Sequence, residues 1–152
     1  MLRAILNLPL DVKAIRLLVA DDNDLKLMMP SATLPFSETE WASKMDASKG
    51  TLSFLVKQNT QVIGHFAFLR INQNPGELAL GLVYLELSKR GTGISTKLIE
   101  LAEKTAFEFL DTKAILLNVM EFNTPASRLY LKLGYKEYER NAGVIRMKKA
   151  IQ

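Results

Sequence analysis

Apolar residues recur along the chain with two different periods, and these predict alternating strands and helices. An apolar run over residues 78–87 predicts a strand, and the segment from there to Leu110 has apolar residues at spacings of three and four, as an amphipathic helix does. Near-continuous apolar residues over 114–120 predict a strand covered on both faces. Pro125 and Gly134 are typical of the first turn and the end of one more helix.

The remaining segments complete a predicted order of β-α-α-β-β-β-α-β-α-β-β. Residues 14–20, rich in Ile, Leu and Val, predict the first strand, and residues 21–29 a short helix. Ser37 and Glu40 form a capping box that begins a second helix. The pattern leaves open whether residues 1–12 pack on the sheet. Hairpins are predicted for residues 51–57 with 61–71 and for residues 135–140 with 144–150, and a turn is predicted over residues 72–76.

A glycine-containing loop, Arg90-Gly91-Thr92-Gly93-Ile94-Ser95-Thr96, joins the strand over 78–87 to the long helix. Glycine lets a backbone come close to a ligand, and a helix N-terminus directs unpaired N–H groups at an anion. Arg90 adds a planar cationic fork suited to phosphate. These features predict a site for a ligand that carries phosphate.

Known phosphate-binding patterns narrow this prediction. A Walker A loop is excluded because no Gly-Lys-Ser/Thr ending is present. A dinucleotide loop would need a third glycine where Thr96 stands, and its acidic residue would be Asp111, at the end of the helix and not on the next strand. A turn without any ligand is the plainest alternative.

Two motifs resemble those of the GNAT superfamily of N-acetyltransferases. The stretch from Arg90 to Ser95 resembles its pyrophosphate-binding loop, Arg/Gln-x-x-Gly-x-Gly/Ala, with Ser95 departing from the pattern at the last position. The stretch from Asn123 to Tyr135 resembles Asn-x-x-Ala-x-x-Leu-Tyr-x-x-x-Gly-Phe, and is most similar to the ribosomal-protein N-acetyltransferase branch. Together the motifs cover residues 78–140.

The resemblance implies an α/β (α+β) GNAT fold, with a mixed, mostly antiparallel, V-shaped sheet of about seven strands flanked by about four helices, in a single domain over residues 1–152. It also implies acetyl-coenzyme A as co-substrate, bound where two strands diverge. Backbone groups near Leu85 and Leu87 would hold the acetyl and pantetheine portions, and the loop amides the pyrophosphate. The cofactor-binding residues expected on this basis are Leu85, Leu87, Arg90, Gly91, Thr92, Gly93, Ile94, Ser95, Thr96, Asn123 and Tyr130.

Tyr130 corresponds to the family tyrosine that protonates the departing coenzyme A thiolate. The alternatives are that Tyr130 only packs in its helix and that Asn123 is an ordinary helix cap. A thiol pKa of about 8.5 makes thiolate a tolerable leaving group, so one nearby donor is sufficient. The reaction would be direct attack of an amine on the thioester, which agrees with the absence of cysteine.

A general base is harder to assign. Relatives place a glutamate at positions aligned here with Ala79, Gly81 and Asn118. Glu77, Glu86 and Glu121 remain candidates, and Glu77 is preferred because it shares strand parity with Ala79 and Gly81. The hypothesis is a proton relayed by water, with Glu77 as the candidate for a direct base.

Composition limits the other possibilities. A chain of 152 residues suits one domain, and 20 basic against 16 acidic residues, scattered along it, are compatible with a polyanionic ligand but not typical of nucleic-acid binding. There is no cysteine and one histidine, His65, expected to be structural, so no metal site is expected. No apolar run approaches the ~20 residues of a membrane span and no signal peptide is recognisable, so we expect a cytoplasmic monomer or homodimer.

Three functional hypotheses follow. The first is an acetyl-coenzyme A-dependent transferase acting on a primary amine, which is either a protein or peptide N-terminus or a small amine. The second is a coenzyme A-binding regulatory module without turnover, and the third a nucleotide-binding α/β domain. In the family, the segment corresponding to Thr33 to Met45 selects the acceptor, so Phe36 and Trp41 would line that pocket or be packed in the core.

Overall fold

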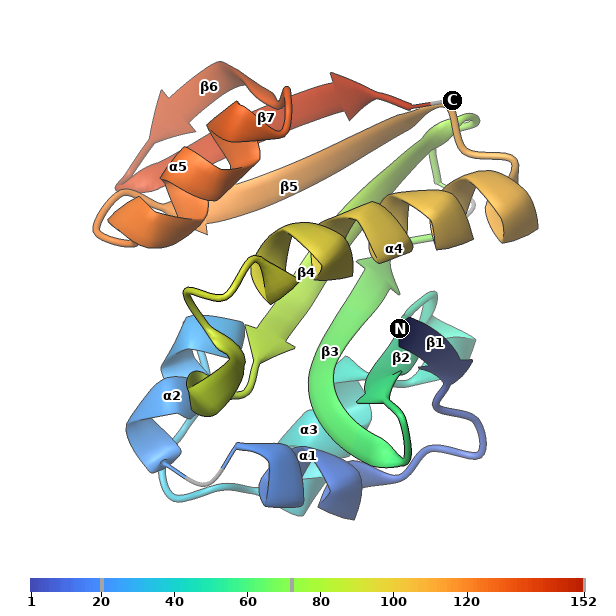
Figure 1. The fold of residues 1–152 in the computed structure, drawn as a ribbon, viewed down its shortest axis with the longest axis vertical. Helices are drawn as coiled ribbons and strands as arrows, with labels where there is room; N and C mark the ends of the chain where they lie inside the picture. The colour runs from blue at the N-terminus through green and yellow to red at the C-terminus, as the bar shows by residue number, and fades with distance from the viewer. Residues whose placement is uncertain (20, 72, 152) are drawn as a thin grey trace.

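The computed structural model describes residues 1–19, 21–71 and 73–151, which form one seven-stranded sheet with helices on both faces (Figure 1). The strands are β1 Leu2–Leu6, β2 Leu52–Gln58, β3 Gln61–Leu69, β4 Glu77–Leu85, β5 Ala114–Met120, β6 Lys136–Asn141 and β7 Val144–Ala150. The helices are α1 Val12–Leu18, α2 Asp22–Met28, α3 Glu38–Lys44, α4 Ile94–Leu110 and α5 Thr124–Lys132, with 3-10 turns η1 Ala47–Lys49 and η2 Leu87–Lys89.

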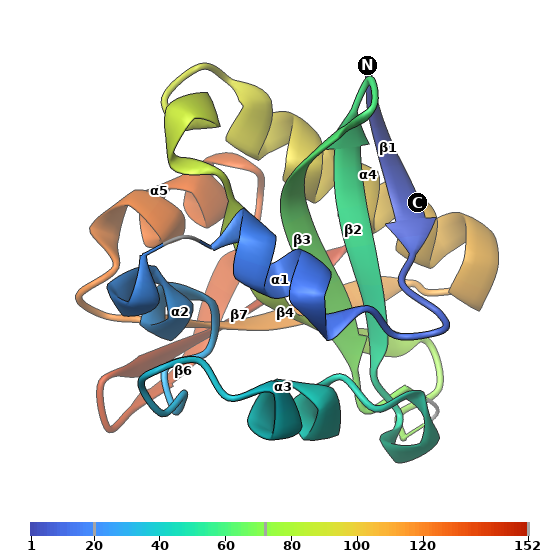
Figure 2. The ribbon, with the colours of Figure 1, turned by 90° about the horizontal axis from the view of Figure 1, so that it is seen from below.

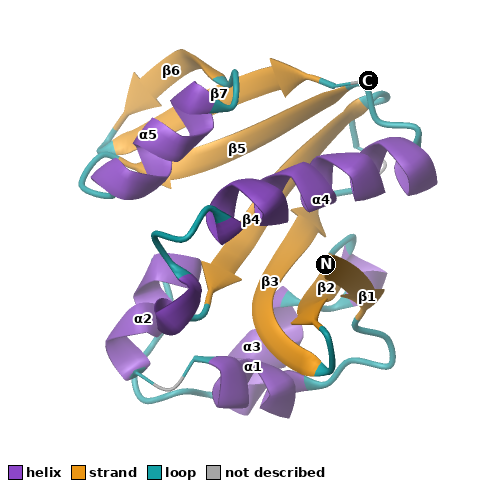
Figure 3. Ribbon diagram, in the orientation of Figure 1, coloured by secondary structure: helices purple, strands orange, loops and turns teal. Residues whose placement is uncertain are grey.

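The sheet opens between its two central strands. Its order is β1-β2-β3-β4-β5-β7-β6, and every neighbouring pair is antiparallel except β4 and β5. These two are paired only from Glu77 with Ala114 to Leu80 with Leu117. Beyond that point they separate, as the arrows in Figure 3 show. The predicted V-shaped, mostly antiparallel GNAT sheet is therefore confirmed.

Helices cover the two faces unequally, and each face has its own core (Figure 2). The long helix α4 packs with α5 on the larger core, which includes Phe66, Leu98 and Ile115. Helices α1 to α3 cover the other face around a smaller core that includes Leu25 and Trp41. The apolar periodicity of α4 explains its place, since Leu98, Ala102 and Thr105 recur at spacings of four and three and are buried. Phe109, the next position of this series, is exposed.

The first strand was predicted in the wrong place. Residues 14–19 belong to helix α1 and its C-cap, and the helix begins after Asp11, whose carboxylate accepts a hydrogen bond from Ala14 N at 3.1 Å. Ile15 and Leu18 are buried while the positions between them are exposed, which is helical spacing. The edge strand is β1, paired with β2, so the segment over 1–12 does pack on the sheet. Ala20 and Asn72, at the edges of a predicted strand and turn, lie outside the described residues.

Strand β4 contains a bulge just where it leaves β5. His65 is opposite Tyr84, but Ala67 is opposite Gly81, so β4 has one more residue than β3 between these pairs. Leu82 has a φ of 51°, in the left-handed region that non-glycine residues seldom adopt. A bulge bends its strand and re-aims the following side chains. Here it directs the last residues of β4 away from β5.

Candidate active site

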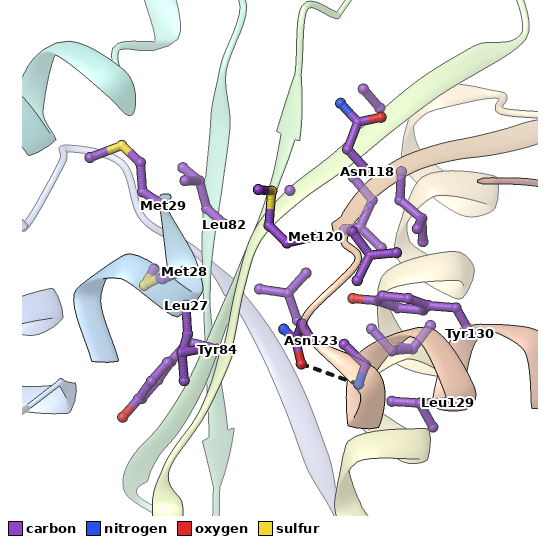
Figure 4. A pocket seen from close by; sticks show the side chains of 18 of the residues that line it. Leu27, Met28, Met29, Leu82, Tyr84, Asn118, Met120, Asn123, Leu129 and Tyr130 are labelled. Atoms are coloured by element: carbon purple, nitrogen blue, oxygen red, sulfur yellow. Dashed lines mark hydrogen bonds between the residues drawn. The ribbon is translucent and has the colours of Figure 1, made fainter. Parts of the chain in front are cut away.

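A cavity of about 1260 Å³ lies where β4 and β5 diverge. Figure 4 shows its two walls, with Met28 and Met29 at the end of α2 on one side and Asn123 and Tyr130 on the other. Strand β4 contributes Leu82 and Tyr84, and β5 contributes Asn118 and Met120. One end of the cavity reaches the loop before α4. The other reaches the face of the sheet that α3 covers.

The loop before α4 has the geometry of an anion cradle. Gly91 and Gly93 have φ values of 74° and 86°, and a Cβ at either would meet nothing within 4 Å. The amides of residues 91–96 make no hydrogen bond to any described residue. They stand at the positive end of the macrodipole of a 17-residue helix. The loop therefore fits a diphosphate held by main-chain N–H groups.

Tyr130 reaches the cavity from α5. Its side chain is buried, and its ring packs edge-on against Tyr135 with centroids 5.7 Å apart. Its hydroxyl points into the cleft (Figure 4) and makes no hydrogen bond to a described residue. Burial raises the pKa of Tyr130 to about 12. The hydroxyl is therefore protonated at neutral pH and free to donate to a ligand.

The side-chain oxygen and nitrogen of Asn123 have separate roles. It is the N-cap of α5, and its Oδ1 accepts from Ala126 N at 3.4 Å (Figure 4). Its side-chain amide N–H groups make no hydrogen bond to a described residue and belong to the cavity wall. The cap and the ligand contact proposed from the sequence are thus compatible with each other.

A family comparison explains this arrangement. The model of the acetyltransferase (GNAT) family matches residues 17–135. The chain belongs to the GNAT acetyltransferase family. Members use acetyl-coenzyme A, which is the co-substrate of this N-acetyltransferase, and the loop geometry fits its diphosphate.

Solved structures share the fold across almost the whole chain. A spermidine N-acetyltransferase from Vibrio cholerae, in complex with coenzyme A and spermine, has a TM-score of 0.80 at 21% identity, covering 99% of this chain and 95% of that one. The Campylobacter jejuni N-acetyltransferase PseH, in complex with acetyl coenzyme A, has a TM-score of 0.74 at 19% identity and 99% coverage of both chains. FdhC, a nucleotide-linked sugar GNAT in its apo form, has a TM-score of 0.75 at 15% identity, covering 98% of this chain and 86% of that one.

Most of the cofactor-binding residues expected for a GNAT enzyme line the cavity, and three do not. Those in its wall are Leu85, Arg90, Gly91, Gly93, Ser95, Thr96, Asn123 and Tyr130. Leu87, Thr92 and Ile94 lie next to the wall, Leu87 in the exposed turn η2. Of these three, Thr92 and Ile94 contribute amides to the loop and Leu87 only precedes it.

The backbone of Leu85 is aimed at the cleft, as expected for a GNAT enzyme. Glu86 N donates to Ile63 O at 2.8 Å, so Glu86 is bonded to β3. Because alternate residues of an antiparallel strand face opposite neighbours, the N–H and C=O of Leu85 point away from β3. The N–H stands at the open edge of β4, where an extended ligand would add like a strand, while the C=O also accepts from Arg90 Nε at 2.8 Å.

Arg90 lines the cavity and also makes contacts within the protein. Its Nε donates to Leu85 O at 2.8 Å, and its guanidinium lies 5.0 Å over the Tyr84 ring. A terminal nitrogen is 3.5 Å from Asp24 Oδ2, which also accepts from Tyr84 Oη. Arg90 therefore ties the loop to β4 and α2 and is also in the cavity wall.

Glu77 lies at the closed end of the V. It is opposite Ala114, where β4 and β5 are still paired, and it forms an ion pair with Lys148. Glu77 lies on the same face of β4 as Ala79, as the alternation of side chains along a strand predicted. It is not in the cavity wall. Glu86 and Glu121 are held by Ser88 and Arg140. Among the described residues, no aspartate or glutamate lines the cavity.

One part of the site was missed by sequence reasoning. Met28 and Met29 belong to the smaller core and also line the cavity, and no local pattern shows that α2 lies beside β4. Trp41, by contrast, is fully buried and stacks on Phe36 at 5.9 Å, so neither residue is in the wall. No cluster of potential metal ligands and no helix able to cross a membrane occurs in the described part of the chain.

Proposed function

We propose that this single domain over residues 1–152 transfers the acetyl group of acetyl-coenzyme A to a primary amine by direct attack. The acceptor is a protein or peptide N-terminus, as in the ribosomal-protein branch, or a small amine. One observation carries the proposal: a single cavity joins the free amides of residues 91–96, the open edge of β4 and the hydroxyl of Tyr130.

Different residues of the cavity hold different parts of the co-substrate. The amides of residues 91–96 hold the diphosphate, and the backbone of Leu85 with the side-chain amide of Asn123 holds the extended arm. The bound co-substrate supplies a thioester carbonyl that an amine can attack. Fixing both reactants in one cleft lowers the entropy cost of their encounter.

Tyr130 acts as the general acid. A new N–C bond forms as the C–S bond breaks, and the phenol donates its proton to the departing sulfur. The phenol keeps this proton at neutral pH because its pKa is raised to about 12. The proton that the attacking amine releases restores the phenol through water in the cleft. The amine hydrogen thus ends on the thiol, and atoms and charge balance.

Removal of a proton from the ammonium acceptor is assigned to water, with Glu77 the candidate if a direct base is used. Water is favoured because no carboxylate of the described residues lines the cavity. The same observation favours a second candidate function, a coenzyme A-binding module without turnover. Both functions require coenzyme A to bind, and only the first requires transfer of the acetyl group.

The deciding experiment measures cofactor binding and thiol release on the same protein. Calorimetric titration with acetyl-coenzyme A is paired with a thiol assay over a panel of amines and peptides. We expect binding and acceptor-dependent release. Tight binding with no release above the hydrolysis background for any acceptor would support the module, and absence of binding would refute both functions.

A further inference from the structure

The end of the cavity under α3 is lined by positive charge. Four cationic side chains, none of them in the cofactor loop, belong to its wall: Lys44, Lys49, Arg70 and Arg146. The other cation of the wall, Arg90, lies at the opposite end and is bonded to Leu85 and Asp24. The acceptor end therefore has cations and no carboxylate among its described lining residues.

Separate segments bring these cations to one face of the sheet. Lys44 ends α3 and Lys49 ends η1, while Arg70 follows β3. Ile71 N donates to Gly50 O at 3.0 Å, which fixes the backbone beside Lys49 against the backbone beside Arg70. The two cations are therefore held at neighbouring points of the rim.

Arg146 joins them from β7. It is opposite Asn118 of β5, which lies in the same wall. Its neighbours Ile145 and Met147 belong to the core under α4 and α5. Because side chains alternate along a strand, Arg146 is on the opposite face of the sheet, the one that α1 to α3 cover.

Nearby groups compensate part of this charge. Lys49 Nζ donates to Ser43 Oγ at 3.0 Å, and the pKa of Asp46 is lowered by its hydrogen bonds with Ser48 and also by the charge of Lys49. Glu77 is paired with Lys148, and Glu139 lies 3.7 Å from Arg146. Asp46 accepts hydrogen bonds from Ser48 N and Oγ at 2.9 and 2.7 Å. Lys44, Lys49 and Arg70 form no ion pair with any described residue.

This charge selects among amines. At a separation of 4 Å, two like charges repel by about 1 kcal/mol in water and about 4 kcal/mol near a protein surface, so a polyamine is disfavoured at each cation it approaches. Met28, Met29 and Leu69 give the same cavity an apolar part of its wall. An acceptor with an amine, an uncharged spacer and an anionic group would therefore suit a cavity that has both apolar and cationic wall residues.

We infer that the acceptor carries a carboxylate or phosphate group, which Lys49 and Arg70, with Lys44 and Arg146, hold while the amine stands in the cleft. The inference rests on the proposed function and defines its substrate class. It also predicts that acceptor binding weakens as salt rises, because screening acts on exposed ion pairs.

Matched acceptors test the inference by turnover. Glucosamine 6-phosphate is compared with glucosamine, phenylalanine with phenylalanine amide, and both pairs with spermidine. The first pair reports a phosphate preference and the second a carboxylate preference. We expect kcat/KM for the anionic member to be higher by about tenfold in at least one pair, and to exceed that of spermidine. A preference for spermidine or for both neutral members would overturn the inference and leave the transferase function standing.

A binding measurement does not depend on turnover. Inorganic phosphate is titrated into protein saturated with coenzyme A, so that the loop amides are already occupied. We expect binding that weakens by about tenfold in the double variant Lys49→Gln/Arg70→Gln and is unchanged in Lys104→Gln, an exposed α4 lysine outside the cavity. No phosphate binding, or equal binding by both variants, would contradict the inference even if thiol release is observed. Failure of thiol release alone would count only against the proposed function.

Discussion

At the scale of single residues, Tyr130 and Tyr135 form a natural pair for separating chemistry from packing. Both are buried and their rings touch edge to face, but only the Tyr130 hydroxyl is in the cavity wall. The Tyr135 hydroxyl donates to Glu103 at 2.7 Å. We expect Tyr130→Phe to lower kcat by about a hundredfold, because general acid catalysis is lost, with cofactor affinity within a few-fold.

Tyr135→Phe is the matched control, since it also removes one buried hydroxyl. It should lower the free energy of unfolding by about 1 kcal/mol and leave kcat near that of the wild type. Steady-state thiol release and chemical unfolding of both variants check this. Equal kcat in Tyr130→Phe and the wild type would remove Tyr130 from the mechanism.

Glu77 gives the residue-scale test of the proton path. Its carboxylate is outside the cavity wall and is paired with Lys148, so we expect Glu77→Gln to change kcat/KM by less than about threefold. The measurement is a pH–rate profile of variant and wild type. A loss of about tenfold or more with the fold intact would instead assign Glu77 as a direct base.

At the scale of elements, the turn into α4 is the proposed binding element for the cofactor. Gly93 and Gly143 both have left-handed φ values, 86° and 79°, and open space at the Cβ position. Only Gly93 belongs to the cavity wall, because Gly143 lies in the β6–β7 hairpin. We expect Gly93→Glu to abolish acetyl-coenzyme A binding, since its carboxylate would repel the diphosphate at the loop amides.

Gly143→Glu introduces the same side chain at the same backbone geometry. Each substitution should lower the free energy of unfolding by about 1–2 kcal/mol, the cost of the left-handed conformation. Calorimetric titration with the cofactor then separates the two variants. Retained affinity in Gly93→Glu, or an equal loss in Gly143→Glu, would show that the loop is not the binding element.

At the scale of the whole molecule, one chain of hydrogen bonds links the edge of the sheet to the bulge of β4. Asn7 Nδ2 donates to Ser53 Oγ at 3.2 Å, and Ser53 Oγ lies 2.6 Å from His65 Nε2. His65 Nδ1 lies 2.7 Å from Leu82 O and donates, because a carbonyl only accepts. This hydrogen bond from the buried imidazole holds the bulge at the point where β4 leaves β5.

This histidine makes stability depend on pH. Burial lowers its pKa to about 4, against about 6.5 in the unfolded chain, so between these values the unfolded chain binds a proton that the folded one does not. Its contribution is fully present above pH 6.5 and is lost as pH falls toward 4, by up to about 3 kcal/mol. Urea unfolding between about pH 7 and 4.5 measures this loss.

His65→Gln is the control, because it cannot titrate in this range. It should be less stable than the wild type at neutral pH, where the link from Ser53 to Leu82 is broken, yet lose less stability as pH falls. Parallel pH dependences for the two proteins would contradict the assignment of this loss to His65.

The geometry of the candidate cofactor site was largely predictable because many of its groups are contiguous in sequence. A strand, a loop with Gly91 and Gly93 and an amphipathic helix determine where the free amides stand, and the motif at Asn123 to Tyr135 identified the opposite wall. Local patterning failed over residues 14–19, where Ile, Leu and Val favoured a strand. The helical spacing of Ile15 and Leu18 and the Asp11 cap decided the actual structure.

The sequence by itself thus determined the fold class and the end of the cavity proposed for the cofactor, since both depend on local periodicity and on neighbouring backbone groups. Only the tertiary structure decided which charges line the end proposed for the acceptor. Lys44, Arg70 and Arg146 are far apart in the chain, and the sheet brings them to one face while pairing Glu77 with Lys148 outside the cavity. Long-range packing, which no local pattern encodes, therefore defines the acceptor end.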